Sequence, residues 1–485
     1  MRALTLAACC VLLAGCTVGP KYERPKAPMP PPTVTAYKEA TDMGTWKVAS
    51  PSDAMLRGKW WQVFREPELD ALEDKLELDN QTIKQAFETY MAARAQIREA
   101  SAGYYPTATI GAGVTSGRAS GNIGGGGATQ RTITTFSAPA EVSWAPDLFG
   151  RVRNAVHAAQ YGAQVSAADL ESQRLLEQAT LAQTYFQIRG QDALQELFDR
   201  TVETNANIVA LTRTLYETGI GTNVAVVQAE QTLESARAQA TGIGVLRARY
   251  EHAIATLLGV PATVFTIPKR AHLTEPPPIP IGTPSELLER RPDIAGAERQ
   301  MAQANAVIGI GYAAYYPSLT LSAGGGVASI ALATLFSGPS LFWSVGASVS
   351  QTVFDGGLRR ATLDRYRAEY NATVANYRQV VLTAFQQVED NLSQTVILSK
   401  EIEQQQRVVS LAQEAFELET FRYQTGLDPY LTLMVQQNVL LVAQQALVNL
   451  RVQEMTSAVL LVEALGGGWN VSDLPTPDQV SKRQK

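Results

Sequence analysis

Residues able to carry out catalysis or bind a metal are few in this chain. Its 485 residues include three histidines, His157, His252 and His272, which lack the close spacing of zinc ligands. The glycine run 124–127 lacks the Gly-Lys-Ser/Thr ending of a phosphate-binding loop. The glycines at 219 and 221 follow a helical pattern, whereas those of a dinucleotide-binding loop follow a strand. We therefore predict no catalytic residue, no metal site, no cofactor, and a protein that is not an enzyme.

Cysteine chemistry is confined to the N-terminus. A charged start precedes an apolar run, Ala3–Ala14, and the small-residue sequence LAGC ends at Cys16, so residues 1–15 are predicted to be a signal peptide. LAGC is similar to the lipobox of bacterial lipoproteins, in which the signal is cut before the cysteine and the thiol carries a diacylglycerol. Cys9 and Cys10 are the only other cysteines, so a mature chain beginning at Cys16 would have no disulfide. An ordinary signal peptide with an incidental cysteine is the alternative.

Composition excludes two further classes. Lys and Arg total 41 against 46 Asp and Glu, a formal net charge of −5, and no basic block stands out. Nucleic-acid binding would require such a basic surface, so no nucleic-acid partner is predicted. After the signal, the longest apolar run, Val327–Phe336, is much shorter than the roughly 20 residues of a membrane-spanning helix. If the chain crosses a membrane, it does so with strands.

The chain contains a long internal repeat. Tyr-Tyr-Pro occurs at 104–106 and again at 315–317, an offset of 211 residues. Tyr-x-Thr-Gly at 216–219 and 423–426, and Leu-Gly at 258–259 and 465–466, are both offset by 207 residues. A near-constant period of this length indicates that one structural unit is duplicated.

Each unit begins with a helix that ends before a proline, and two strands follow it. The helical segments are Leu69–Gly103 and Pro292–Ala314, and Pro106 and Pro317 terminate them. Small residues then alternate with β-branched or aromatic ones over runs of about ten residues, as in transmembrane strands. Glycine flexibility or the edge of a soluble sandwich is the alternative interpretation. The predicted strands are 107–116, 134–144 (weakened by Pro139), 318–329 and 343–354.

A hairpin of two long helices is predicted after the second strand of each unit. Residues 147–260 and 355–428 contain no proline, and a helix over Arg151–Glu217 would extend about 100 Å. Glycine after Thr218 and Thr425 can adopt the left-handed conformation that ends a helix, which places the hairpin tips there. The predicted helices are 151–217 and 223–258, then 358–425 and 430–465.

The apolar residues of the helix at 358–425 repeat every eleven positions, in steps of 3, 4 and 4. That period is about 3.67 residues per turn, close to a relaxed helix, so such helices can lie nearly parallel. A two-stranded coiled coil would favour a period of seven. The stripe consists of Leu363, Tyr366, Tyr370, Val374, Tyr377, Val381, Phe385, Val388, Leu392 and Val396.

Four strands cannot close a barrel by themselves. In lipid every backbone donor and acceptor needs a partner, and bacterial barrels have at least about eight strands. Two copies would supply eight strands to a shared barrel, and three copies would supply twelve. The predicted fold class is an α+β membrane protein built from a duplicated strand, strand, long-helix-hairpin unit.

Several further motifs occur in order along the chain: WWQVFREPEL at 60–69, LDN at 78–80, LFGR at 148–151, the two Tyr-x-Thr-Gly tips, ERRPDI at 289–294 and ALGGGW at 464–469. Together with the LAGC sequence, they resemble the motifs of the outer membrane efflux proteins, in particular the lipoprotein branch that works with resistance-nodulation-division pumps. The resemblance extends from about Cys16 to Trp469. It implies a homotrimer with a twelve-stranded β-barrel in the outer membrane, a twelve-helix α-barrel in the periplasm and an equatorial collar. The implied function is a passive exit duct, with a periplasmic adaptor and an inner-membrane pump as partners.

The resemblance also implies where the duct closes. In this family, tyrosine, arginine and acidic side chains at the hairpin tips hold the channel shut until the adaptor and pump separate them. The pattern corresponds to Tyr216 in the first tip and to Leu418, Arg422 and Tyr423 in the second. Solvated helix-end side chains are the alternative for each position.

One position departs from the family pattern. Thr420 stands where an aspartate is expected, and Glu417 and Glu419 flank it. Either glutamate supplies the acidic group of the gate, or the closure depends on Leu418, Arg422 and Tyr423 alone.

Two further groups of residues follow from the predicted strands. Tyr105-Pro106 and Tyr316-Pro317 are expected where helices meet strands. Aromatic residues near strand ends are candidates for membrane girdles, with ordinary packing as the alternative, and the glycine-rich loop Ser120–Thr129 is expected to face outside. The girdle candidates are Phe136, Trp144, Phe342 and Trp343.

The predicted location is the outer membrane, with a lipid anchor at Cys16 and a body in the periplasm. A structural coiled-coil adaptor of the periplasm, without a channel, is the alternative function. Adaptors usually flank one hairpin with a split β domain, whereas here the order strand, strand, hairpin occurs twice. The predicted organisation is a signal peptide (1–15), a lipidated segment (16–60), a first repeat (61–270), a linker (271–291), a second repeat (292–470) and a tail (471–485).

Overall fold

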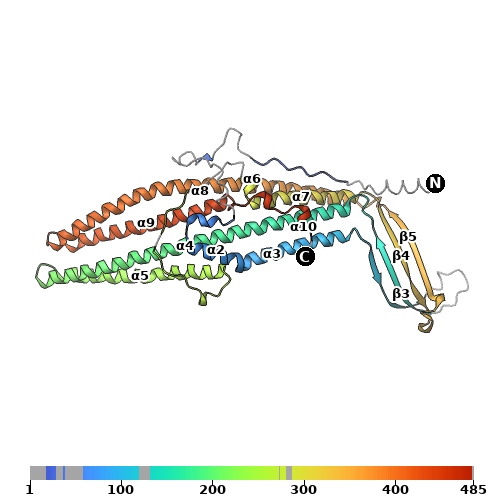
Figure 1. The fold of residues 1–485 in the computed structure, drawn as a ribbon, viewed down its shortest axis with the longest axis horizontal. Helices are drawn as coiled ribbons and strands as arrows, with labels where there is room; N and C mark the ends of the chain where they lie inside the picture. Colours follow the sequence, from blue (N-terminus) through green and yellow to red (C-terminus); the bar gives the residue numbers. More distant parts are fainter. Residues whose placement is uncertain are drawn as a thin grey trace.

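The computed structural model describes residues 18–28, 37–38, 58–118, 132–271, 273–279 and 287–482. The predicted signal peptide, Cys16, His272 and the loop Ser120–Thr129 lie outside these residues. The molecule is long, with helices along most of its length and a β-sheet at one end (Figure 1). The tips of the two helical hairpins lie at the opposite end from the sheet.

The two halves of the chain contain helices of equal length, as a duplication requires. Both long helices have 67 residues, both return helices have 35, and the helices before the strands have 22. The ends of the four hairpin helices agree with the predicted ranges to within one residue. The hairpin helices are α4 (Arg151–Glu217), α5 (Asn223–Leu257), α8 (Leu358–Gln424) and α9 (Tyr430–Ala464), and the helices before the strands are α3 (Gln81–Ala102) and α7 (Pro292–Ala313).

The segment predicted as a single helix over Leu69–Gly103 is two helices, α2 (Pro67–Asp79) and α3. Asn80 separates them because its backbone is extended, with φ −61° and ψ 124°. Its side-chain oxygen accepts a hydrogen bond from the N–H of Ile83 at 2.9 Å, so Asn80 is the N-cap of α3. The prediction of one helix was wrong because a capping asparagine lies inside an otherwise helical pattern.

Short helices stack end to end to make full-length columns beside the long ones. At one junction, Asn80 Nδ2 donates to the carbonyl of Leu257 at 2.8 Å, which joins the start of α3 to the end of α5. At the equivalent junction, Arg291 Nη1 donates to the carbonyl of Ala464 at 3.1 Å, which joins α7 to α9. Helix α4 packs against α3, α5, α7 and α9, and α8 packs against α7 and α9. One chain therefore forms a layer of four helical columns.

The repeated Leu-Gly motif has its explanation at these junctions. Gly259 and Gly466 have positive φ angles of +66° and +96°, a region that favours glycine. A Cβ atom at Gly259 would lie 2.6 Å from the carbonyl oxygen of Asp79, and one at Gly466 would lie 1.9 Å from that of Arg290. Any side chain at these positions would therefore separate the stacked helices.

The core lies where the columns meet near the middle of the body. The eleven-residue stripe of α8 is confirmed there, because Tyr377, Val381, Val388 and Leu392 are fully buried. They pack with apolar residues of α4 and α9 and with the 3₁₀-helix η3 (Trp60–Phe64). The other short elements are η4 (Ala262–Val264), α6 (Leu287–Arg290), η6 (Leu332–Thr334), η7 (Gly338–Ser340), η8 (Val471–Asp473) and α10 (Pro477–Ser481).

The sheet is antiparallel with the order β1/β2, β3, β4, β5. The predicted first strand is divided into β1 and β2, both paired with β3 in the same register. Pro139 lies in the middle of β3, opposite the gap between β1 and β2. Its carbonyl accepts a hydrogen bond from the N–H of Gly111 at 2.9 Å, but proline has no backbone N–H to donate in return. The strands are β1 (Thr107–Ile110), β2 (Gly113–Arg118), β3 (Thr132–Trp144), β4 (Ser318–Ser329) and β5 (Leu341–Ser350).

The last strand is shifted from its predicted range of 343–354. It begins at Leu341, which pairs with Val327, and ends at Ser350, which pairs with Ser318. Ser318 is the first residue of β4 and directly follows Pro317, so residues after Ser350 have no strand opposite them. The end of β5 is therefore set by the start of its neighbour.

Candidate functional site: channel wall and hairpin tips

The sheet has one apolar and one polar face. The register places Val142, Ala323 and Val345 in one row on the first face, and the side chains of Trp343 and Val345 there are 77% and 75% exposed. On the opposite face, Ser143, Ser322 and Gly346 form a row of small polar or neutral residues. Alternation of this kind matches a barrel strand with lipid on one side and water on the other.

Both edges of this sheet are open within the described strands. The outer edges are β1/β2 and β5, and neither pairs with another described strand. An open edge is not tolerated in lipid, because unpaired backbone groups there cost several kcal/mol each. The sheet therefore needs further strands on both sides.

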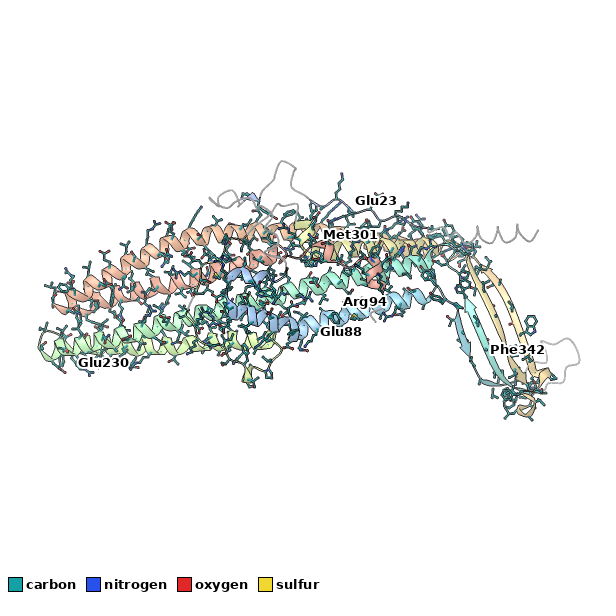
Figure 2. The ribbon with its side chains drawn as sticks, viewed as in Figure 1. Glu23, Glu88, Arg94, Glu230, Met301 and Phe342 are labelled. Carbon is teal, nitrogen blue, oxygen red and sulfur yellow. The ribbon has the colours of Figure 1, made fainter. Side chains whose placement is uncertain are left out.

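The aromatic candidates divide between the two faces. Phe136, Trp144 and Trp343 lie on the apolar face, and the Trp144 indole N–H donates to the carbonyl of Tyr104 at 3.0 Å. Phe342 pairs with Gly326 on the polar face, at the end of the sheet far from the helices (Figure 2). A lipid-facing girdle that contains both Phe342 and Trp343 is therefore wrong, because successive strand residues point to opposite faces.

The two Tyr-Pro sequences lie at the helix-to-strand junctions. Pro106 falls between α3 and β1, and Pro317 falls between α7 and β4. Tyr316 stacks on Phe149, with ring centroids 4.8 Å apart, whereas Tyr105 is exposed.

At the other end, two tyrosines connect the hairpin tips. Tyr423 of α8 donates its hydroxyl to Thr212 Oγ1 of α4 at 2.9 Å, and Tyr430 of α9 donates to Thr232 Oγ1 of α5 at 3.3 Å. The two tyrosine rings contact edge to face at 5.9 Å. The buried cluster around them consists of Ile208, Leu215, Ala229, Tyr423, Tyr430 and Leu433.

Arg422 pairs with a residue that sequence reasoning missed. Its guanidinium binds both carboxylate oxygens of Asp428, with Nη2 to Oδ1 at 3.1 Å. The ion pair lowers the pKa of Asp428, while burial and the charge of Asp428 raise the pKa of the neighbouring Glu419. Thr420 Oγ1 donates to the carbonyl of Phe416 at 2.7 Å. The signal for Asp428 was its place two residues after Gly426 of the Thr-Gly turn.

Other predicted tip residues do not join these contacts. Tyr216 is 47% exposed and Leu418 is 61% exposed. The structure therefore places Glu419 and Arg422 beside Asp428, directs Tyr423 to Thr212 and Tyr430 instead, and leaves Tyr216 and Leu418 at the surface of the single chain.

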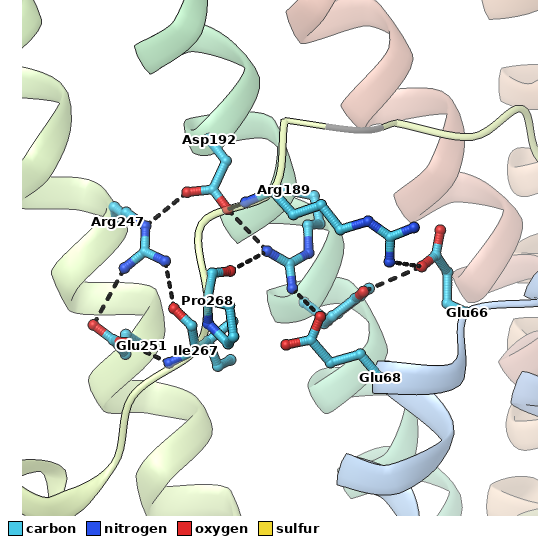
Figure 3. Close-up of polar contacts among 10 residues, drawn as sticks. Glu66, Glu68, Arg189, Asp192, Arg247, Glu251, Ile267 and Pro268 are labelled. Carbon is cyan, nitrogen blue, oxygen red and sulfur yellow. Dashed lines mark hydrogen bonds and ion pairs between the residues drawn. The ribbon is translucent and has the colours of Figure 1, made fainter.

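Between the tips and the sheet, a buried ion network holds the segment 265–270 against the long helices (Figure 3). Arg189 of α4 donates to Asp192 at 2.9 Å and to the carbonyl of Pro268 at 2.8 Å, and it pairs with Glu68 of α2. Arg247 of α5 donates to the other oxygen of Asp192 at 2.7 Å. Sequence reasoning missed this network, because its members are far apart along the chain.

A second buried group in this region lacks such partners. Glu73 of α2 is fully buried, and neither of its carboxylate oxygens has a hydrogen-bond partner in the described parts of the chain. Burial, and then the carboxylates of Glu77, Asp70 and Asp74, raise its pKa well above the usual range. The folded protein therefore keeps this proton at pH values where the unfolded chain has lost it.

The Glu73 carboxyl should make the protein more stable at acidic than at neutral pH. Its contribution is largest below the unfolded pKa of about 4.3 and falls by up to about 1.4 kcal/mol per pH unit as pH rises towards the folded pKa. We expect the urea midpoint of the intact protein to fall between pH 5 and pH 8. The midpoint of Glu73→Gln should fall less over the same pH range. Glu88→Gln, at an exposed position of α3, is the control. An identical pH response of the intact chain and Glu73→Gln would contradict this account.

The described residues were compared with two kinds of functional feature, a metal site and a membrane-spanning helix. No group of three His, Cys, Asp or Glu side chains there could hold a metal ion. One described helix, α9, is long and apolar enough to cross a membrane, and the core helix of a soluble protein can meet the same criteria.

The chain is similar in sequence and in structure to proteins of one known family. The family described as "Outer membrane efflux protein" matches residues 72–260 and 283–467, one match in each half of the chain. The chain belongs to the outer membrane efflux protein family. It is 32% identical to the probable efflux pump outer membrane protein TtgC of Pseudomonas putida, over 96% of this chain and 95% of that one.

Other relatives agree. The pyoverdine export outer membrane protein OpmQ of Pseudomonas aeruginosa is 31% identical, over 97% of each chain. The structure of the outer-membrane channel OprN matches with a TM-score of 0.82 and 28% identity, over 94% of this chain and all of that one. This efflux protein is thus an outer-membrane channel of an efflux system, and the predicted alternative of a periplasmic adaptor is not supported.

Proposed function

We propose that three copies of this efflux protein form one continuous exit duct. Each copy would add four strands to a twelve-stranded barrel in the outer membrane and four helical columns to a twelve-helix barrel in the periplasm. The observation that carries the proposal is the sheet, which has an apolar face, a polar face and two open edges. Closure by copies of the same chain satisfies all three features, because β5 of one copy can pair with β1/β2 of the next.

The duct would conduct passively what an inner-membrane pump of the resistance-nodulation-division class delivers through a periplasmic adaptor. The relative OpmQ is named for pyoverdine export and TtgC for efflux without a named compound. The pump rather than the duct is expected to select the substrate, because a passive duct takes whatever the pump delivers.

The tips would form the closed end of the duct. Tyr423 and Tyr430 join the second hairpin to the first, and Arg422 is held in place by Asp428. Contact with an adaptor would have to break these links for the hairpins to separate. Leu418 and Tyr216, exposed in one chain, would then be available to neighbouring copies.

The N-terminal segment supports a lipid anchor at Cys16. The N–H of Val18 donates to the carbonyl of Phe149 at 3.4 Å, beside the helix-to-strand junction. Farther along, Tyr22 donates to Glu298 at 2.6 Å and Arg24 donates to Tyr377 at 3.2 Å, so the segment runs along α7 and α8 away from the sheet. The described chain therefore begins at Val18 beside the helix-to-strand junction, and we propose the lipid anchor two residues earlier in the sequence.

The lipid is tested separately from the channel. Cells grown with radiolabelled palmitate should label the intact protein and leave Cys16→Ala unlabelled. Intact protein that takes up no label would show that the lipid proposal is wrong.

The duct is tested by deletion and assembly. Deleting the gene in its host should raise accumulation of a fluorescent efflux substrate, and the intact gene should reverse this. Arg237→Ala, which removes only an exposed pair with Glu234, should restore efflux equally. Light scattering of the purified protein should give the mass of three chains. A monomer in every detergent, together with unchanged accumulation after deletion, would refute the proposal.

A further inference from the structure

We propose that Glu141 forms an acidic ring that makes the barrel prefer cations to anions. The inference rests on the proposed trimeric duct, because each chain supplies one such carboxylate. The described strands contain only two charged residues, Arg118 and Glu141. Arg118 is the last residue of β2, and its partner Thr132 lies nine residues before Glu141 on β3, about 30 Å along the strand.

The register places Glu141 on the polar face. It lies opposite Thr109 on one side and Gly324 on the other, and Gly324 lies opposite Ser344. The next residue, Val142, lies on the apolar face in a row with Ala323 and Val345. A carboxylate on the lumen side stays hydrated, whereas a charged side chain on the lipid side destabilises a barrel.

The local surroundings leave this charge uncompensated. Glu141 is exposed, and it has no hydrogen bond or ion pair with any described residue. The neighbour of Glu141 on β4 is Gly324, which has no side chain. A Cβ atom added at Gly324 would lie 3.9 Å from Glu141 Cγ and 3.4 Å from Ser344 Oγ, so these three positions share one face. The carboxylate thus projects from a wall of small, uncharged residues.

Three such carboxylates at one level of the barrel would act together. Clefts lined by one sign of charge, with low-dielectric walls, raise the local concentration of the opposite ion. Rings of Asp or Glu side chains are one way in which channels select cations. The ring would therefore favour cations and cationic compounds at the step where they cross the outer membrane.

The reactivity of single introduced cysteines tests which face of the sheet contacts water. Glu141→Cys in intact cells should react with a charged, membrane-impermeant methanethiosulfonate reagent, and Val142→Cys should react at least about tenfold more slowly. The intact protein is the background control. Faster reaction at 142 than at 141 would overturn the assignment of the faces and the ring with it.

Reversal potentials under a KCl gradient test the charge itself. The variants are compared in planar bilayers on a background with Arg422→Ala and Tyr423→Ala, so that the tips do not limit the current. Glu141→Gln should lower the permeability ratio of K⁺ to Cl⁻ about two- to tenfold, and Glu141→Lys should lower it further. Ser344→Ala, in the same row, should leave the ratio unchanged.

The outcomes separate this inference from the proposed function. Normal conductance with an unchanged ratio in Glu141→Gln and Glu141→Lys would refute the acidic ring and leave the duct intact. No conductance in any variant, including the background, would refute the duct and the ring together.

Discussion

Replacing Arg422 and Tyr423 together by alanine should raise the open fraction of the duct by at least about tenfold. Tyr423 is buried and links α8 to Thr212 of α4, and removal of a buried aromatic ring costs about 3–5 kcal/mol. Loss of Arg422 also frees Asp428, whose carboxylate it binds through two hydrogen bonds. Because about 1.4 kcal/mol changes an equilibrium tenfold, even part of this loss is enough to shift the tips.

Single-channel conductance in planar bilayers and uptake of a large hydrophilic antibiotic by cells measure this effect. Tyr423→Phe keeps the contact with Tyr430 and removes only the hydroxyl, so it should have a smaller effect, from about 0.5–1.5 kcal/mol of lost hydrogen bonding. Arg213→Ala is the matched control, because it removes an exposed tip arginine that pairs with Glu230 at 2.6 Å. A double variant that conducts no more than Arg213→Ala would contradict the assigned gate.

Replacing Arg189 by alanine should destabilise the body by about 3–5 kcal/mol, the usual cost of breaking a buried ion pair from one side. The Arg189 side chain is only 2% exposed and lies over the Tyr185 ring, 4.8 Å from its centroid. Its removal leaves Glu68 without this partner and releases the carbonyl of Pro268. The segment 265–270 would then be held by one arginine in place of two, since Arg247 still donates to the carbonyl of Ile267 at 2.8 Å.

Urea unfolding followed by helical circular dichroism measures the change. Arg200→Ala on the same helix is the control, since its pair with Glu196 is exposed and such pairs contribute at most about 1 kcal/mol. Arg189→Lys tests geometry, because a single ammonium group cannot reproduce contacts that the guanidinium makes in three directions. Equal midpoints for Arg189→Ala and Arg200→Ala would mean that the network does not stabilise the body.

Local patterns in the chain were enough to predict most elements. The absence of proline over long runs and the glycine after Thr218 and Thr425 set the hairpin helices to within a residue. The eleven-residue stripe of α8 identified side chains that are now seen buried in the core. These features depend on residues near one another along the chain, so the sequence alone contains them.

The candidate site was predictable only in part, because some of its contacts join residues that are far apart along the chain. Arg422 and Tyr423 were identified through the resemblance to the efflux protein family, but their partners Asp428 and Thr212 were not. Thr212 lies in the other half of the chain, and nothing local marks it as the acceptor for a tyrosine hydroxyl. That Asp428 is the acidic partner of Arg422 depended on how the turn folds back on α8.

By itself the sequence determined that one unit occurs twice, that its helices are long and that its strands alternate between two faces. The tertiary structure alone decided that α3 stacks on α5 and that β5 ends opposite the first residue of β4. It alone also brought Arg189 to Pro268 and Glu68. Periodicity follows from the geometry of a single helix or strand, whereas junctions, strand ends and buried ion pairs follow from which distant segments share the same space.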